Sequence, residues 1–172
     1  MSKILAINIF RFFILLFIQV FLLKNIVFYG LNIPFLYILF ILLLPFKTPN
    51  SLLFALSFLM GLSVDLFSDT LGLHAAACTV MAFVRIFFIN ITVQEDNHDY
   101  EPEPKLGLMG FRWFFFYTLL LTFVHHFFLF NLEVFKFDEI GNTISRVFIS
   151  SLFTLLLIFA EEIVFYRKKQ RK

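Results

Sequence analysis

The chain has 172 residues, of which 60% are hydrophobic and 15% charged, and its formal net charge is +2. Soluble domains are about half apolar and about a quarter charged, so this composition excludes an ordinary water-soluble domain. Continuous apolar runs of roughly 20 residues recur along the chain, and that length crosses a hydrocarbon core of about 30 Å. A transmembrane barrel would instead show weakly alternating runs. The predicted fold class is an all-α integral membrane protein, with residues 1–172 forming one membrane domain.

Six transmembrane helices are predicted. The first is expected to be retained, because no small-residue cleavage site of a signal peptide follows it. The second is short and is bounded by Pro34 and Pro45, which suit a helix start and the turn after a helix. In chain order the spans are residues 4–23, 33–46, 50–66, 71–93, 111–132 and 143–165, and a basic tail follows at 166–172.

The lysines and arginines predict the orientation of these spans. With both termini in the cytoplasm, six basic residues of the inner segments and five of the tail lie inside, while only Lys24, Lys136 and Arg146 lie outside. Such an excess of basic residues marks the cytoplasmic side of a membrane protein. The turn that carries Asp65 and Asp69 is therefore predicted to face outward.

Ionisable groups within spans are costly, by about 2.5–3.5 kcal/mol at a helix centre, and each needs a reason. Asp65 ends the third span. It is interpreted either as a solvated or helix-capping carboxylate before the fourth span, where Asp69 or Thr70 could also cap, or as a partner or cation contact. Arg85, in the fourth span, is expected to snorkel to the inner interface or to pair with a carboxylate of another span.

Three histidines lie in the outer halves of spans, at His74, His125 and His126. Adjacent residues of a helix point about 100° apart, so His125 and His126 are not expected to share one metal ion. No metal-ligand spacing such as HExxH is present, and interhelical hydrogen bonds are the favoured interpretation. Neither a cofactor nor a catalytic residue is predicted, because no nucleophile–base set can be found, and the chain is not expected to be an enzyme.

Small residues predict a close helix pair around the outward turn. Ser57 and Gly61 lie four residues apart in the third span, and a run of small residues from Ala75 opens the fourth. Small side chains let two membrane helices approach closely. The third and fourth spans are therefore expected to pack as a tight hairpin.

The segment from Met60 to Gly72 reads MGLSVDLFSDTLG and follows the short proline-bounded span. It resembles the pattern M-G-x-x-x-D-L-x-S-x-T-L-G of the rod shape-determining protein MreD family, and the resemblance covers roughly residues 33–90. The candidate family-motif and partner-contact residues are Pro34, Pro45, Gly61, Asp65, Leu66, Ser68, Thr70, Leu71, Gly72 and Arg85.

The resemblance implies a non-enzymatic scaffold of the bacterial inner membrane. Such a scaffold binds MreC and acts with RodA, a class B transpeptidase and, indirectly, MreB to direct lateral peptidoglycan synthesis and maintain rod shape. The implied fold is similar to the substrate-binding component of energy-coupling-factor transporters. The alternative is a small-molecule-binding component of a vitamin-uptake transporter, which should show a polar, aromatic pocket open outward. Anionic lipid is expected at the basic tail, at about 1 kcal/mol per basic residue, and no nucleic acid is expected.

Overall fold

The computed structural model describes residues 2–25, 34–93, 103–134 and 140–165, and every regular element in these ranges is helical. Five of the helices are long and apolar enough to cross a membrane, which indicates a multi-pass membrane protein. Their membrane-length segments are Leu5–Leu22, Asn50–Ser68, Leu73–Thr92, Phe111–Val134 and Gly141–Val164.

The elements follow one another without long irregular stretches inside the described ranges. Helix α1 continues through a π-helical turn, η1, and a 3₁₀ turn, η2, and two short helical pieces, η3 and α2, precede the long helix α3. Their bounds are α1 Ser2–Phe17, η1 Ile18–Leu22, η2 Leu23–Asn25, η3 Leu36–Ile38, α2 Leu39–Leu42, α3 Asn50–Ser68, α4 Leu73–Thr92, α5 Leu106–Met109, α6 Phe111–Val134 and α7 Ile140–Val164.

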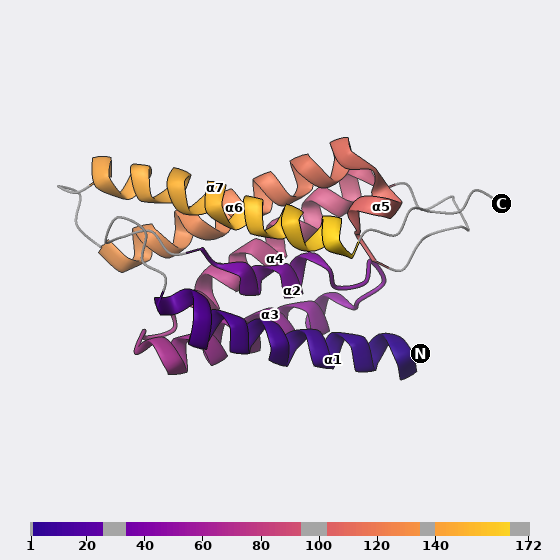
Figure 1. Cartoon of the computed structure of the whole chain (residues 1–172), viewed down its shortest axis with the longest axis horizontal. Helices are drawn as coiled ribbons and strands as arrows, with labels where there is room; N and C mark the ends of the chain where they lie inside the picture. The colour runs from indigo at the N-terminus through magenta and orange to yellow at the C-terminus, as the bar shows by residue number, and fades with distance from the viewer. Residues whose placement is uncertain (1, 26–33, 94–102, 135–139, 166–172) are drawn as a thin grey trace.

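The long helices form an elongated bundle (Figure 1). Helix α4 packs between α3 and α6, α7 packs on α6, and α1 packs on α3. The start of α1 and the end of α7 lie at the same end of the bundle, on the right of Figure 1. We call this the terminal end, and we call the opposite end, where α3 turns into α4, the turn end.

The predicted span at residues 33–46 does not form a helix of membrane-spanning length. Residue 33 lies outside the described residues, and the rest contains only η3 and the single α-helical turn of α2. Helices α1 and α3 both run toward the turn end, so the chain returns between them along residues 34–46 (Figure 1). Residues 37–44 are each 2% exposed or less. Non-helical backbone at membrane depth is tolerated where protein surrounds it, and this return segment meets that condition.

Side chains of the surrounding helices satisfy the backbone of the return segment near the turn end. The Gln19 amide donates to the carbonyl oxygen of Pro34 at 3.2 Å and accepts from the backbone N–H of Tyr37 at 3.5 Å. The backbone N–H of Phe35 donates to Thr154 Oγ1 of α7 at 3.0 Å. These bonds replace the ladder that a regular helix would supply, and each unmade one would leave a costly buried polar group.

Arg85 serves the same purpose at the other end of the return segment. Its side chain is 2% exposed, and it donates to the carbonyl oxygen of Leu44 at 2.5 Å and to the Tyr117 hydroxyl at 2.9 Å. Tyr117 in turn donates to the carbonyl oxygen of Leu42 at 2.8 Å. The prediction that Arg85 snorkels to an interface is therefore wrong, because the Leu44 carbonyl and the Tyr117 hydroxyl hold the guanidinium inside the bundle. No ion pair of Arg85 is found among the described residues.

Charged residues at the terminal end tie the segment after residue 102 to the bundle. Arg11 donates to the carbonyl oxygen of Leu43 at 3.3 Å and lies 3.6 Å from the Glu103 carboxylate. Glu162 of α7 accepts from the backbone N–H of Leu106 at 2.9 Å, at the start of α5. The acidic stretch 94–102 and the basic tail 166–172, with its expected lipid contact, lie outside the described residues.

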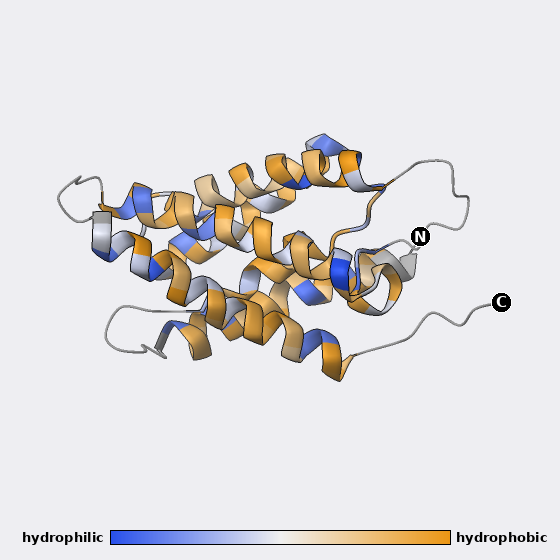
Figure 2. Cartoon of the chain, turned by 90° about the horizontal axis from the view of Figure 1, so that it is seen from above, coloured by the Kyte–Doolittle hydropathy of each residue, from blue (hydrophilic) through white to orange (hydrophobic). Residues whose placement is uncertain are grey.

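The outer surface of the bundle is strongly apolar. Orange, apolar residues dominate the helices in Figure 2, and several blue, hydrophilic residues lie toward the two ends. Phenylalanines of the first helix, such as Phe10, Phe13 and Phe17, are more than half exposed. Exposed apolar area on this scale is expected where lipid replaces water as the solvent.

Candidate functional site

The turn between α3 and α4 is built around the buried carboxylate of Asp65. One oxygen, Oδ1, accepts from the Thr70 hydroxyl at 2.5 Å and from the backbone N–H of His74 at 3.1 Å, and lies 2.9 Å from His74 Nδ1. The other oxygen, Oδ2, accepts from the backbone N–H of Ala75 at 2.9 Å. His74 and Ala75 are the second and third residues of α4, the two positions that a capping side chain usually serves. Asp65 therefore caps α4 from the preceding helix.

The residues between Asp65 and α4 explain why the cap comes from the preceding helix. Asp69 has φ +55° and ends α3 in the left-handed conformation, and its predicted role as a cap of α4 is not seen. The N-cap position is Gly72, with φ +80°, which has no side chain to offer. The helix dipole also favours a negative charge at this helix start. Of the two interpretations of Asp65, the structure thus shows the helix-capping one.

Gly61 brings the two helices of the turn into close contact. A Cβ atom built on Gly61 would lie 2.5 Å from the Cα atom of Ala75 and 2.5 Å from the carbonyl oxygen of His74. Only hydrogen fits in that space, and α3 and α4 touch backbone to backbone. The predicted tight hairpin is confirmed.

The motif residues between these contacts face outward. Leu66 is 74% exposed and Leu71 is 99% exposed, whereas Ser68 is partly buried. A leucine so exposed, on a turn held by the hydrogen bonds of Asp65, is a candidate contact for another protein. The motif thus contains two buried residues, Gly61 and Asp65, three half-buried ones, Ser68, Thr70 and Gly72, and the two outward leucines.

The remaining predicted site residues lie away from this turn. Pro34 and Arg85 belong to the contacts of the return segment, as described above. The Pro45 carbonyl accepts from the backbone N–H of Thr48 at 3.1 Å, in the turn that leads into α3. The residues that carry the resemblance therefore lie in two separate parts of the structure, the return segment with its contacts and the α3–α4 turn.

The histidines gather around one aromatic ring in the interior. The Phe35 ring centroid lies 5.6 Å from that of His74, 6.1 Å from that of His125 and 5.3 Å from that of His126. His125 Nε2 lies 2.7 Å from the Tyr37 hydroxyl.

His126 bridges two helices through Thr154. Its Nε2 atom lies 3.2 Å from the Thr154 hydroxyl of α7. The predicted interhelical hydrogen bonds of the histidines are thus present. Over the described ranges, no group of three His, Cys, Asp or Glu side chains is placed to hold a metal ion.

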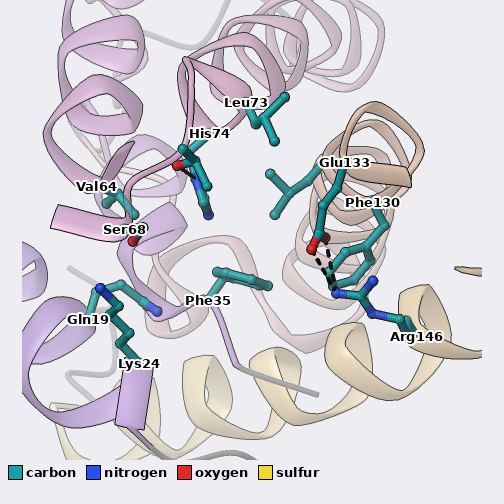
Figure 3. Close-up of a pocket in the computed structure, with 12 residues that line it drawn as sticks. Gln19, Lys24, Phe35, Val64, Ser68, Leu73, His74, Phe130, Glu133 and Arg146 are labelled. Carbon is teal, nitrogen blue, oxygen red and sulfur yellow. Dashed lines mark hydrogen bonds and ion pairs between the residues drawn. The ribbon is translucent and has the colours of Figure 1, made fainter. Parts of the chain in front are cut away.

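A cavity of about 190 Å³ opens beside the Asp65 network at the turn end (Figure 3). It draws its walls from five separated parts of the chain and combines apolar, aromatic and charged side chains. The lining residues are Gln19, Lys24, Phe35, Val64, Ser68, Thr70, Leu73, His74, Leu129, Phe130, Glu133 and Arg146.

Two cationic side chains line this cavity, Lys24 and Arg146, and each contacts a different group. Lys24 donates to the backbone carbonyl of Phe67 at the end of α3. Arg146 donates to both oxygens of Glu133, at 3.3 and 3.0 Å, and its Cζ atom lies 4.4 Å from the centroid of the Phe130 ring. The sequence marked Lys24 and Arg146 only as basic residues of the outer side. The signal that could have identified them is that charges near the ends of apolar spans need partners.

No protein-family model, curated protein or solved structure matches the chain.

Proposed function

We propose that this protein is a non-enzymatic membrane scaffold of the bacterial cell-elongation machinery, of the MreD kind, and that it binds MreC. The single observation that carries the proposal is the α3–α4 turn. Its buried residues fix the backbone, and Leu71 projects from it 99% exposed. A rigid turn with an exposed apolar tip suits a contact with a membrane-anchored partner close to the bilayer surface. The proposed partners beyond MreC are RodA, a class B transpeptidase and, indirectly, MreB.

The proposed setting is the bacterial inner membrane with both termini in the cytoplasm and the turn end outside. The chain would cross six times, five times as long helices and once as the buried return segment. The even number of passes is supported by the position of the start of α1 and the end of α7, which lie at the same end of the bundle (Figure 1). A likeness to the substrate-binding component of energy-coupling-factor transporters is part of the same proposal.

Co-purification with cognate MreC tests the scaffold proposal. The tagged chain and MreC are expressed together, extracted in mild detergent and recovered by the tag. We expect MreC to be retained by the wild type and its recovery to fall roughly tenfold for Leu71→Ser, the loss of one apolar contact of about 1.4 kcal/mol.

The matched control is Leu52→Ser, since Leu52 is also exposed but lies in the first turn of α3, at the terminal end. It should leave MreC recovery unchanged. Absence of MreC from the wild-type eluate would contradict the scaffold role, and an equal loss in both variants would contradict the assignment of the contact to the turn.

A second candidate function is a small-molecule-binding component of a vitamin-uptake transporter. The observation that favours it is the cavity at the turn end, which has the polar and aromatic lining that this alternative requires. Recovery of ATPase subunits and a coupling protein, in place of MreC, from cross-linked native membranes would favour this second function over the scaffold.

A further inference from the structure

We propose that the cavity at the turn end binds a small organic anion: a carboxylate or similar acid on a compact apolar body. The proposal goes beyond the scaffold role and does not depend on it; it names a ligand class for the cavity that also favours the second candidate function. It rests on the charges of the cavity, its apolar wall and its size, which are taken in turn below.

The charged side chains of the cavity favour an anion. Among the residues that the structure describes, Lys24 and Arg146 line it against the carboxylate of Glu133, so this lining carries one excess positive charge. Lys24 uses one of its three donors on the Phe67 carbonyl. Arg146 contacts Glu133 through one guanidinium nitrogen, and the Glu133 side chain is 45% exposed, so this nitrogen can change partners. Lysine and arginine donors of this kind are the groups that recognise a carboxylate.

The nearby carboxylate of Asp65 does not cancel this excess. Asp65 is not among the residues that line the cavity, and both of its oxygens already accept hydrogen bonds from the start of α4. Its charge is balanced by the N–H groups and by the dipole of that helix. A ligand in the cavity therefore meets Lys24, Arg146 and Glu133 as its charged neighbours.

The rest of the wall favours a compact apolar body. Phe35 and Phe130 place their ring centroids 6.0 Å apart, and Val64, Leu73 and Leu129 complete the apolar lining. In Figure 3, the Phe35 ring lies between Lys24 on one side and Arg146 on the other. A volume of about 190 Å³ exceeds the roughly 150 Å³ that holds benzene in an engineered cavity and is below the roughly 300 Å³ of the smallest drug-sized sites. The ligand is accordingly of the size of benzoate.

Glu133 competes with the ligand for Arg146. It occupies one guanidinium nitrogen with both of its oxygens, while its side chain is 45% exposed. An incoming anion can take the guanidinium nitrogen that Glu133 holds and displace this exposed carboxylate toward solvent. Because Glu133 competes with the ligand, removal of the Glu133 charge should strengthen ligand binding, whereas removal of the Arg146 charge should weaken it.

The test uses 4-fluorobenzoate as the probe, with fluorine NMR on the full chain in detergent and a protein-free micelle sample as the blank. We expect saturable binding to the wild type and none of the neutral 4-fluorobenzamide. Arg146→Gln should weaken binding roughly tenfold or more, the loss of a charge-assisted hydrogen bond. Glu133→Gln should strengthen it several-fold. Arg112→Gln, an exposed arginine at the terminal end, should change nothing.

Further variants keep the test decisive if Arg146→Gln does not fold. Lys24→Gln should weaken binding through the second cation, and Leu73→Trp should abolish it by filling the cavity from a partly buried position. Absence of saturable binding to the wild type, or equal binding of the benzamide, would overturn the proposal. So would weakening by Arg146→Gln and Glu133→Gln alike, since that result marks an ion pair that only holds α6 and α7 together.

Discussion

Asp65 shows how one side chain can fix a turn at the end of a membrane hairpin. It is 2% exposed, and its two oxygens take hydrogen bonds from Thr70, His74 and Ala75. Hydrogen bonds to a charged acceptor are worth about 1.5–3 kcal/mol each before desolvation of the carboxylate is subtracted. The net effect is to hold the start of α4 against the end of α3.

Replacing Asp65 by asparagine tests this role. The amide keeps one acceptor oxygen but places an NH₂ group against a backbone N–H, so we expect a loss of about 2 kcal/mol in the free energy of unfolding. The measurement is an unfolding titration in mixed micelles. Asp69→Asn is the matched control, because Asp69 is exposed and asparagine tolerates its left-handed backbone; it should change stability by less than about 0.5 kcal/mol. Equal losses would show that the Asp65 carboxylate has no special role.

The pairing of α3 with α4 depends on the absence of a side chain at Gly61. A methyl group there would overlap backbone atoms of Ala75 and His74, which cannot rotate away. The helices would have to separate, and the contacts of their small residues would weaken along the hairpin.

We therefore expect Gly61→Ala to destabilise the protein by about 1–3 kcal/mol, the usual range for overpacking. Thermal unfolding in detergent checks this value. Gly141→Ala is the control: a Cβ there meets open space within 4 Å, and alanine favours a helix over glycine by up to about 1 kcal/mol. A Gly61→Ala protein as stable as Gly141→Ala would contradict the close approach.

The return segment depends in the same way on single side chains of the helices around it. Thr154 of α7 accepts from the backbone N–H of Phe35, across the interior of the bundle. Thr118 of α6 is equally buried but donates only to carbonyls of its own helix, at Phe114 and Phe115.

These two threonines form a matched pair for valine substitution. Thr154→Val removes the acceptor of the buried Phe35 N–H and the partner of His126 Nε2, and should cost about 1–3 kcal/mol. Thr118→Val leaves no buried donor without an acceptor, so its free energy of unfolding should stay within about 0.5 kcal/mol of that of the wild type. The difference is measured by unfolding titration, supported by faster hydrogen exchange of the Phe35 amide in the Thr154 variant. If both variants behave alike, the return segment does not rely on this bond.

At the scale of the whole molecule, the path of the chain fixes its topology. Helices α1 and α3 run in the same direction, and the return segment between them carries the chain back through the interior (Figure 1). The turn after Pro45 and the α3–α4 turn therefore lie at opposite ends of the bundle.

Cysteine accessibility tests this arrangement in a Cys78→Ala background. Lys47→Cys and Leu71→Cys replace exposed residues of the two turns. We expect a membrane-impermeant maleimide to label Leu71→Cys in intact spheroplasts and Lys47→Cys only after permeabilisation. Labelling of both from outside would contradict the topology with the return segment as a sixth pass.

Short stretches of the sequence were enough to predict several features of this protein. Apolar length and the Pro and Gly residues at turns predicted α3, α4, α6 and α7 to within a few residues, and small residues predicted the α3–α4 hairpin. These signals are local, since hydropathy and turn preference act on neighbouring residues.

Three other features depend on contacts between distant parts of the chain: the path of residues 34–46, the burial of Arg85 and the cavity at the turn end. The sequence predicted a sixth helix there and a snorkelling arginine, because an apolar run and a lone charge carry no information about distant partners. Those partners are far apart in the chain: Arg85 and Leu44 are separated by 41 positions, and Phe35 and Thr154 by 119. A buried backbone group must be paired, but its sequence neighbours do not specify the side chain that pairs with it.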